Sequence, residues 1–207
     1  MEYRKIELND YKNIMERFGV SSLVGKVVDS MRYDTADTVS FFADERYGDP
    51  VENCLRQAAA FLEKVRDEND KAFVYGDYDC DGICATTIMT NLLERMGIPH
   101  GYYIPNRFKE GYGLNLDRLK QAYDKGYRVL ITVDNGVSAQ PGLEWAVSNG
   151  MKVMVTDHHT INGKVECDVL VHPSLMTRPY RYLCGAGVAY VLARYLKKAD
   201  ERRSEER

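Results

Sequence analysis

The feature that most constrains the fold is a regular alternation of short β-rich runs and amphipathic helical segments that begins near residue 71. The runs are KAFVY (71–75), PHGYYI (99–104), RVLITV (128–133), KVMVT (152–156) and VLV (169–171). Helices are predicted between the first four runs, at 83–96, 115–125 and 139–149. Because parallel strands need such crossovers, this order predicts an α/β fold with a mainly parallel five-stranded sheet and helices on both faces.

Residues 1–70 have a different pattern. Apolar residues recur at three- and four-residue spacing in IMERFGV, LVGKVVDSM and ENCLRQAAAFLEKVRDEN, as is typical of amphipathic helices. We therefore predict a helical N-terminal region over 1–70 and an α/β domain over 71–207. The chain after Leu196 is almost wholly charged, and we expect it to be a fraying helix end.

Composition narrows the function classes. The chain has 207 residues, of which 44% are hydrophobic, enough for a packed core. No apolar run reaches the ~18 residues that a membrane span needs, and MEYRKIELND is unlike a secretory signal, so a cytoplasmic protein without membrane contact is expected. The net charge of −3 argues against a globally basic nucleic-acid binder but leaves room for a local basic groove.

The five cysteines are odd in number and form no C-x-x-C pair, so they are interpreted as reduced thiols. Cys80 and Cys84 are expected to be small side chains in a packed turn and helix, not metal ligands.

Acidic residues and histidines directly follow three of the predicted strands. They are Asp77, Asp79 and Asp81 after the first, Asp134 after RVLITV, and Asp157, His158 and His159 after KVMVT. The carboxyl ends of parallel strands meet at one edge of a sheet, so these side chains should converge. If residues 77–81 stay extended, their three carboxylates lie on the same side. So many like charges would repel one another without cations, and two divalent ions would nearly neutralise four carboxylates.

The ligand types indicate which metal such a site prefers. Several carboxylates, one or two imidazoles and no thiolate suit Mn²⁺ or Mg²⁺, and the histidines favour Mn²⁺. A calcium EF-hand is the alternative, because D-x-D-x-D-G matches its first six positions. Its twelfth position requires a bidentate Glu, however, and here it is Ile88, with a strand before the loop instead of a helix.

His158 and His159 are adjacent in a segment expected to be extended, so their side chains should face opposite ways. We expect one to bind metal and the other to face a substrate. A satisfied core histidine is the alternative for either residue.

Two further segments are candidates for phosphate contact. In NRFKEGYGL (106–114), Arg107 offers a bidentate fork and Tyr112 a ring for stacking on a base, although an ordinary solvated loop is an equal alternative. In CGAGVAYVLARYL (184–196), Gly185 and Gly187 open a helix. Their absence of a side chain either lets the helix N-terminus approach an anion or, as we favour, lets the helix pack closely on the sheet.

Four motifs in this order resemble the DHH phosphoesterase superfamily: D-Y-D-x-D-G at 77–82, T-V-D-N-G at 132–136, T-D-H-H at 156–159 and G-A-G-V-A at 185–189. The stretch I-P-N-R-F-K-E-G-Y-G-L is similar to that of RecJ-type single-stranded-DNA exonucleases within the superfamily. The resemblance covers most of the chain.

The resemblance implies a two-metal hydrolase that uses Mn²⁺ or Mg²⁺. Its implied metal-site residues are Asp77, Asp79, Asp81, Asp134 and His158, with Asp134 shared by both ions, while Asp134 and His159 are catalytic and Asp157 orients the imidazoles. Arg107, Tyr112, Gly185 and Gly187 are implied to bind substrate. The implied activity is hydrolysis of single-stranded DNA from the 5′ end in DNA repair or recombination, with single-strand-binding protein as a further candidate partner.

The sequence departs from the family pattern at its C-terminal end. Relatives carry a further metal-ligating aspartate and a DHHA1-type α/β domain after the G-A-G-V-A helix, and neither is present before Arg207. We expect either a fragment or a shortened relative, with one weak metal position and low activity on its own. The alternatives are a DHH phosphoesterase acting on short oligonucleotides, cyclic dinucleotides or pyrophosphate, and a non-catalytic scaffold, which the intact motifs disfavour.

Overall fold

The computed structural model describes residues 10–30, 52–106, 113–177 and 180–205, with side chains described as far as residue 197. The chain divides into two compact units, Met1–Gly48 and Asp49–Arg207.

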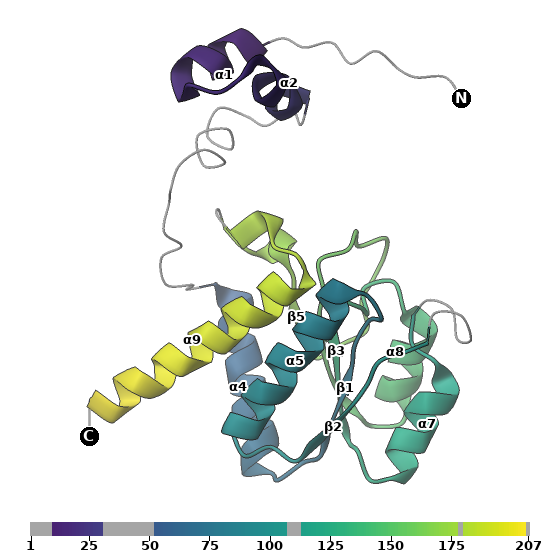
Figure 1. Ribbon diagram of the computed structural model, residues 1–207. Coiled ribbons are helices and arrows are strands. Elements are labelled where there is room, and N and C mark those ends of the chain that lie inside the picture. Colours follow the sequence, from purple (N-terminus) through teal and green to yellow (C-terminus); the bar gives the residue numbers. More distant parts are fainter. Residues whose placement is uncertain (1–9, 31–51, 107–112, 178–179, 206–207) are drawn as a thin grey trace, which may run out of the picture. The chain divides into compact units, whose positions relative to one another are not determined.

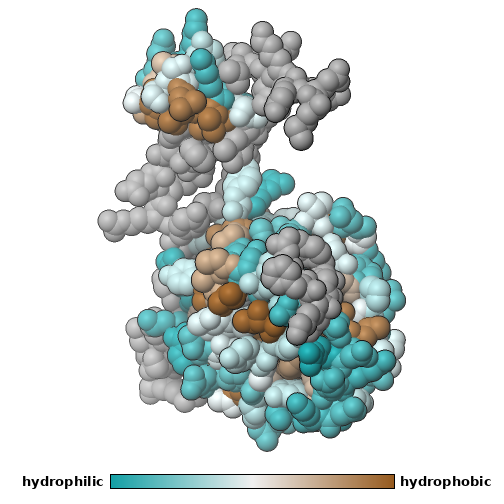
Figure 2. All heavy atoms as spheres, turned by 45° about the vertical axis from the view of Figure 1, so that its right-hand side comes forward, coloured by the Kyte–Doolittle hydropathy of each residue, from teal (hydrophilic) through white to brown (hydrophobic). Residues whose placement is uncertain are grey.

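The N-terminal unit contains two short helices, α1 (Tyr11–Phe18) and α2 (Ser22–Ser30). Helix α1 ends at Gly19, whose φ of 64° is the left-handed conformation typical of a helix C-terminus. Leu23, Val24 and Val27 of α2 are exposed, and Figure 2 shows an apolar patch on this unit. These two helices confirm the helical structure that the amphipathic pattern predicted for this part of the sequence.

The second unit is built on a five-stranded parallel sheet (Figure 1). Its strands are β1 (Ala72–Tyr75), β2 (His100–Tyr103), β3 (Val129–Val133), β4 (Lys152–Thr156) and β5 (Val169–Val171), in the order β2-β1-β3-β4-β5. All four strand pairs are parallel. The chain winds outward in one direction from β1 to β2 and in the other from β3 to β5, so β1 and β3 flank the switch point where open α/β sheets bind ligands.

Helices cover both faces of the sheet, which confirms the predicted fold class (Figure 1). One face carries α4 (Asn53–Asp67), α5 (Cys80–Arg95) and α9 (Gly185–Glu205), and the other carries α7 (Leu116–Asp124) and α8 (Gln140–Ser148). The 3₁₀ turns η1 (Pro173–Leu175) and η2 (Tyr180–Tyr182) lie between β5 and α9. Helix α4, which was expected in the N-terminal helical region, contacts β5 and α9.

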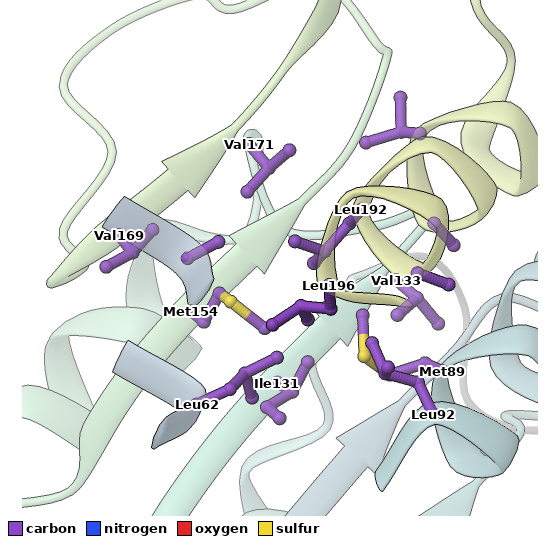
Figure 3. Packing of buried hydrophobic residues seen from close by; sticks show 14 of the residues in the cluster. Leu62, Met89, Leu92, Ile131, Val133, Met154, Val169, Val171, Leu192 and Leu196 are labelled. Atoms are coloured by element: carbon purple, nitrogen blue, oxygen red, sulfur yellow. The ribbon is translucent and has the colours of Figure 1, made fainter. Parts of the chain in front are cut away.

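The core under α4, α5 and α9 fixes these helices relative to the strand ends (Figure 3). Its fully or nearly fully buried side chains include Leu62, Met89, Ile131, Met154 and Leu192, which come from three helices and two strands. Burying a side chain of this size stabilises a fold by about 1.5–3 kcal/mol. Because α5 and α9 both begin at the carboxyl edge of the sheet, this packing also holds their first turns there.

Within the part of the chain that the structure describes, no helix combines the length and apolar character needed to cross a membrane.

Candidate metal centre

The turn after β1 becomes a helix within the D-Y-D-C-D-G motif. Asp79 is the N-cap of α5, and its Oδ1 accepts a hydrogen bond from the Gly82 amide at 3.0 Å. The condition that residues 77–81 stay extended is therefore not met, because aspartate at an N-cap starts a helix here. As a result Asp81 lies in the first turn of α5, separated from Asp77 and Asp79.

Gly82 lets α5 pack against the preceding loop. A Cβ at this position would lie 2.6 Å from both Cβ and the carbonyl oxygen of Asp77. The glycine thus has a packing role in a helix, unlike the turn glycine of a calcium loop. Cys80 and Cys84 are exposed on α5, so the expectation that they are packed side chains was wrong.

Asp81 joins α5 to the N-terminus of α9. Its Oδ2 accepts from the Gly185 amide at 2.7 Å and its Oδ1 from the Ala186 amide at 2.8 Å. Burial acts to raise the pKa of Asp81, but hydrogen bonds from Ala186, Cys184 and Gly185 outweigh it and hold the pKa below its ordinary value. The anion that this helix terminus contacts is therefore a carboxylate of the chain itself.

The two glycines of G-A-G-V-A allow different close approaches. A Cβ on Gly185 would lie 2.2 Å from Oδ1 of Asp134, so this glycine brings the backbone of α9 against the site. A Cβ on Gly187 would meet Leu183 at 3.0 Å, which is a packing contact. Substrate binding by either glycine stays a prediction.

Asp134 follows β3 in an unusual environment. Its φ of 54° is uncommon for a residue other than glycine, and it is 2% exposed. Its Oδ1 is buried and accepts no hydrogen bond from the described residues, although Nε2 of His158 lies 3.2 Å away. Burial and the charge of Asp81 raise the pKa of Asp134 to about 7. A buried carboxylate oxygen without a donor is costly, and a bound cation would remove that cost.

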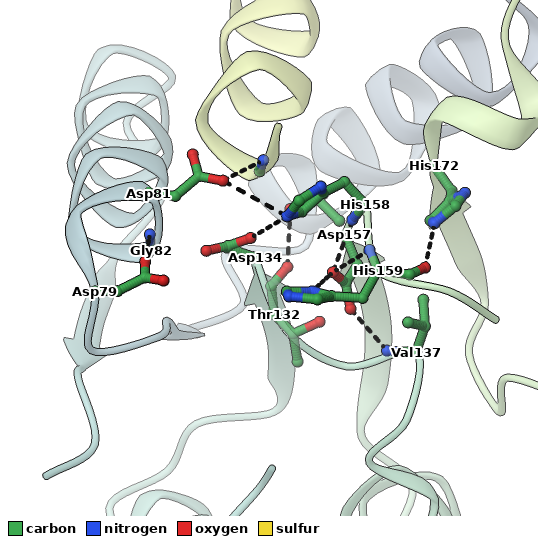
Figure 4. A network of polar contacts seen from close by, with 12 residues as sticks. Asp79, Asp81, Gly82, Thr132, Asp134, Val137, Asp157, His158, His159 and His172 are labelled. Carbon is green, nitrogen blue, oxygen red and sulfur yellow. Dashed lines mark hydrogen bonds and ion pairs between the residues drawn. The ribbon is translucent and has the colours of Figure 1, made fainter. Parts of the chain in front are cut away.

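Asp157 organises the D-H-H segment after β4 (Figure 4). It is 1% exposed, and its Oδ2 accepts from the Val137 amide at 3.0 Å. Its Oδ1 faces the amides of His158 and His159, at 2.7 and 3.2 Å, and Nδ1 of His159 at 2.7 Å. Burial acts to lower the pKa of His159, but the hydrogen bond with Asp157 outweighs it, so the pKa is raised. Asp157 contacts the ring of His159, and its role in orienting the imidazoles stays a prediction.

The two histidine rings do not face opposite ways. Their centroids are 4.5 Å apart, with 48° between the ring planes. Nε2 of His158 lies 3.2 Å from Oδ1 of Asp134 and 3.6 Å from Oδ2 of Asp81 (Figure 4). The segment leaves its extended conformation after β4, so the strand alternation on which the expectation rested ends before the histidines.

Two groups of possible ligands share Asp134. One contains Asp77, Asp79 and Asp134, and the other contains Asp134, His158 and His159, with the ligand atoms of each group within 4.8 Å of one another. Carboxylates with imidazoles and no thiolate suit Mn²⁺ or Mg²⁺. The donor set, and the buried oxygen of Asp134 that accepts no hydrogen bond from the described residues, therefore fit divalent cations. Asp81 belongs to neither group.

A pocket of about 230 Å³ opens beside these groups. It is lined by Asp77, Gly113, Asp134, Asn135, Gly136, Val137, Ser138, Asp157 and His159. Three of the candidate ligands, Asp77, Asp134 and His159, thus border a space that a small phosphate-bearing group can enter.

Two of the predicted substrate-binding residues lie in a segment that the structure does not describe. Arg107 and Tyr112 lie outside the described residues, so their contact with substrate stays a prediction.

His172 was not predicted from the sequence. It directly follows β5, and its Nε2 lies 2.9 Å from the His159 carbonyl oxygen. Its position at a strand end was a signal that could have identified it.

Comparisons with known proteins identify the family of the chain. A family model described as the DHH family, N-terminal domain, matches residues 71–206. The single-stranded-DNA-specific exonuclease RecJ of Bacillus subtilis is 32% identical over 202 residues, covering 94% of this chain and 26% of that protein. RecJ of Thermus thermophilus is 36% identical over 138 residues, covering 67% and 21%.

Solved structures give the same result. A crystal structure of exonuclease RecJ bound to manganese is 33% identical with a TM-score of 0.67, and the match covers 74% of this chain and 40% of that one. A crystal structure of the Thermus thermophilus RecJ in complex with Mn²⁺ is 26% identical with a TM-score of 0.66, covering 93% and 27%. The chain spans about a quarter of the length of the curated relatives it matches. We conclude that the chain belongs to the DHH family and that its DHH domain is similar to that of the RecJ exonucleases.

Proposed function

We propose that the chain provides the catalytic DHH domain of a metal-dependent phosphodiesterase that degrades single-stranded DNA from the 5′ end. The observation that carries this proposal is Asp134, which is shared by two ligand groups and has a buried oxygen that accepts no hydrogen bond from the described residues. The printed names of the relatives supply the substrate class, since they are single-stranded-DNA-specific exonucleases. A role in DNA repair or recombination, and contact with single-strand-binding protein, are further parts of the proposal.

Asp77, Asp79, Asp134 and His158 would hold two divalent ions. Mn²⁺ is favoured over Mg²⁺ because the ligands include an imidazole. When bound, such ions activate water near neutral pH and offset the charge of the phosphate. Asp81 would contribute mainly by holding the N-terminus of α9 against the site, because backbone amides already engage both of its oxygens.

His159 is the residue that we assign to the phosphate. It borders the pocket, and its Nδ1 is 2.7 Å from the buried Asp157 carboxylate, which fixes the ring and favours its protonated form. A protonated ring can donate a hydrogen bond to a non-bridging phosphate oxygen and stabilise negative charge there. Arg107 and Tyr112 are proposed to contact the strand itself.

The test compares Asp134→Asn with Asp124→Asn, which makes the same change at an exposed position on α7. Asp134→Asn should weaken Mn²⁺ binding and lower hydrolysis of a 5′-phosphorylated single strand by more than about 100-fold, beyond the range seen when groups around metal ligands are altered. Asp124→Asn should change neither. Calorimetric Mn²⁺ titration follows binding even if the chain hydrolyses slowly.

Undiminished hydrolysis by Asp134→Asn, or hydrolysis that persists in chelator, would contradict the proposal. Cleavage of cyclic dinucleotides or pyrophosphate in preference to the single strand would keep the metal centre and replace the substrate. Product analysis on strands labelled at either end determines the polarity.

A further inference from the structure

His172 lies where β5 ends and holds a position between two loops. The side chain is buried, with 6% of the residue exposed. Its Nε2 is 2.9 Å from the carbonyl oxygen of His159 (Figure 4), and its Nδ1 is 2.8 Å from Oγ of Ser174 and 3.1 Å from the Ser174 amide nitrogen. The imidazole therefore bridges the D-H-H segment and the first turn of η1.

The chemistry of its partners assigns the ring's protons. A backbone amide can only donate, so Nδ1 of His172 must accept from Ser174. A carbonyl oxygen can only accept, so Nε2 must carry the proton that it donates to His159. The neutral ring with its proton on Nε2 satisfies both contacts.

His159 is held at three points. Oδ1 of Asp157 accepts from its amide at 3.2 Å and contacts Nδ1 of its ring at 2.7 Å. The third contact, from His172 to its carbonyl, comes from another strand end. The two contacts to Asp157 hold the amide and the ring of His159, and the third holds its carbonyl oxygen and so fixes the peptide plane that follows.

We propose that His172 is a positioning residue for His159, fixing the orientation in which the His159 ring meets the phosphate. The inference rests on the proposed function for its effect on catalysis, but the positioning itself is a property of the chain. His172 itself neither lines the pocket nor belongs to either group of candidate ligands, so it acts through the His159 backbone.

The experiment separates positioning from stability with three variants. His172→Phe keeps a ring of similar size and removes both nitrogens. His172→Gln restores an N–H donor at a reach close to that of Nε2. Thr177→Val loosens the same segment elsewhere, because it removes the hydroxyl that hydrogen-bonds to Glu52 while leaving His159 untouched.

His172→Phe should lower kcat by about 10- to 100-fold with KM near its original value, the size expected for loss of a group that orients an active-site histidine. His172→Gln should recover most of that loss. Thr177→Val should lower the melting temperature without lowering kcat. An equal fall in kcat for Thr177→Val at matched loss of stability, or an unchanged kcat for His172→Phe, would overturn the proposal.

A second readout does not depend on activity. In the native chain the ring nitrogens of His159 should give ¹⁵N NMR signals of one fixed state, with Nδ1 hydrogen-bonded to Asp157. His172→Phe should shift or broaden these signals, and Thr177→Val should leave them in place. If the native chain fails to hydrolyse single strands, the proposed function fails but the NMR result still decides the role of His172. Unchanged His159 signals in His172→Phe refute that role.

Discussion

Asp81 and Asp134 lie at the same edge of the sheet and both approach Nε2 of His158, yet the protein treats them differently. Asp81 receives two backbone hydrogen bonds from the start of α9, and its pKa is lowered. Asp134 is more deeply buried, Oδ1 receives no hydrogen bond from the described residues, and its pKa is raised to about 7.

The difference follows from burial and hydrogen-bond donors together: burial is the main cause that raises the pKa of Asp134, whereas hydrogen bonds from Ala186, Cys184 and Gly185 lower the pKa of Asp81. The protein already compensates the charge of Asp81, which makes that residue a tie between α5 and α9. The charge of Asp134 is left for something else to compensate, and a divalent cation is the partner that its neighbours fit. Both aspartates follow a strand of the sheet, but Asp81 binds the start of α9 and Asp134 is left as a candidate metal ligand.

Gly185→Ala should break this arrangement most strongly, because one glycine supports both halves of it. Its amide donates to Asp81, and an added Cβ would stand 2.2 Å from Oδ1 of Asp134. Helix α9 must then move, at a cost to folding of about 1–3 kcal/mol for overpacking. We expect Mn²⁺ affinity to fall by at least about tenfold, the lower range for disturbed surroundings of a metal ligand. Urea unfolding and calorimetric titration measure the two effects.

Gly187→Ala is the matched control. The nearest atom to its added Cβ is Cδ2 of Leu183, at 3.0 Å, which is the end of a flexible side chain. Alanine is also favoured over glycine within a helix by about 1 kcal/mol, which offsets part of the strain. Equal losses of Mn²⁺ affinity in the two alanine variants would mean that the contact with Asp134 has no special effect.

Asp81→Asn should sharpen the comparison with a smaller effect. The neutral amide side chain has a single acceptor oxygen, so one of the two α9 amides loses its acceptor and the other keeps only an uncharged one. We expect a loss of about 1.5–3 kcal/mol in folding stability, the range for hydrogen bonds to charged groups. Mn²⁺ affinity should fall less than in Asp134→Asn, because Asp81 belongs to neither ligand group.

Asp79→Asn controls for the removal of a charge near the site. Asparagine caps helices as well as aspartate does, so the bond to the Gly82 amide can persist and folding stability should change little. A stability loss in Asp79→Asn as large as that in Asp81→Asn would attribute the effect to charge and not to the tie between helices.

The sequence allowed the sheet and the meeting of its strand ends to be predicted, because alternation and strand-end placement are local patterns with one global solution. It did not reveal how each side chain would turn. Whether residue 81 is extended or helical depends on the N-cap at Asp79, and its task depends on α9, more than a hundred residues later. His172 follows a predicted strand, which was a signal for it, but only the folded chain shows its contact with His159.

Helix α4 is a second example, because it was expected in the N-terminal helical region but packs within the unit that contains the sheet. Its apolar stripe correctly predicted a helix, but such a stripe does not indicate which element of the fold it packs against. In the structure this face, which includes Leu55 and Leu62, packs on the sheet beside α9. The periodicity of apolar residues predicts which side of a helix is buried, but only the tertiary contacts show which elements pack against that side.

The pH dependence of folding stability should also distinguish the two aspartates, and it is the smallest of the effects that we predict. Asp134 has an ordinary pKa of 3.8 that folding raises to about 7, so its contribution to stability is fully present at low pH and is lost as pH rises through 7. The lowered pKa of Asp81 acts oppositely, and its contribution is lost only as pH falls below the ordinary range. His159, whose pKa is also raised, changes in the same direction as Asp134, so the comparison needs Asp134→Asn.

As pH rises from about 4 to about 7, the metal-free native chain should lose more melting temperature than Asp134→Asn does, because only the native chain has a buried carboxyl at position 134 whose ionisation folding opposes. Added Mn²⁺ should stabilise the native chain more at the higher pH, since the metal binds the ionised carboxylate and competes with its proton. Differential scanning fluorimetry over this range, with and without Mn²⁺, measures both. Parallel curves for the two proteins would show that the buried oxygen of Asp134 carries no unmet charge, and the contrast with Asp81 would then be one of geometry alone.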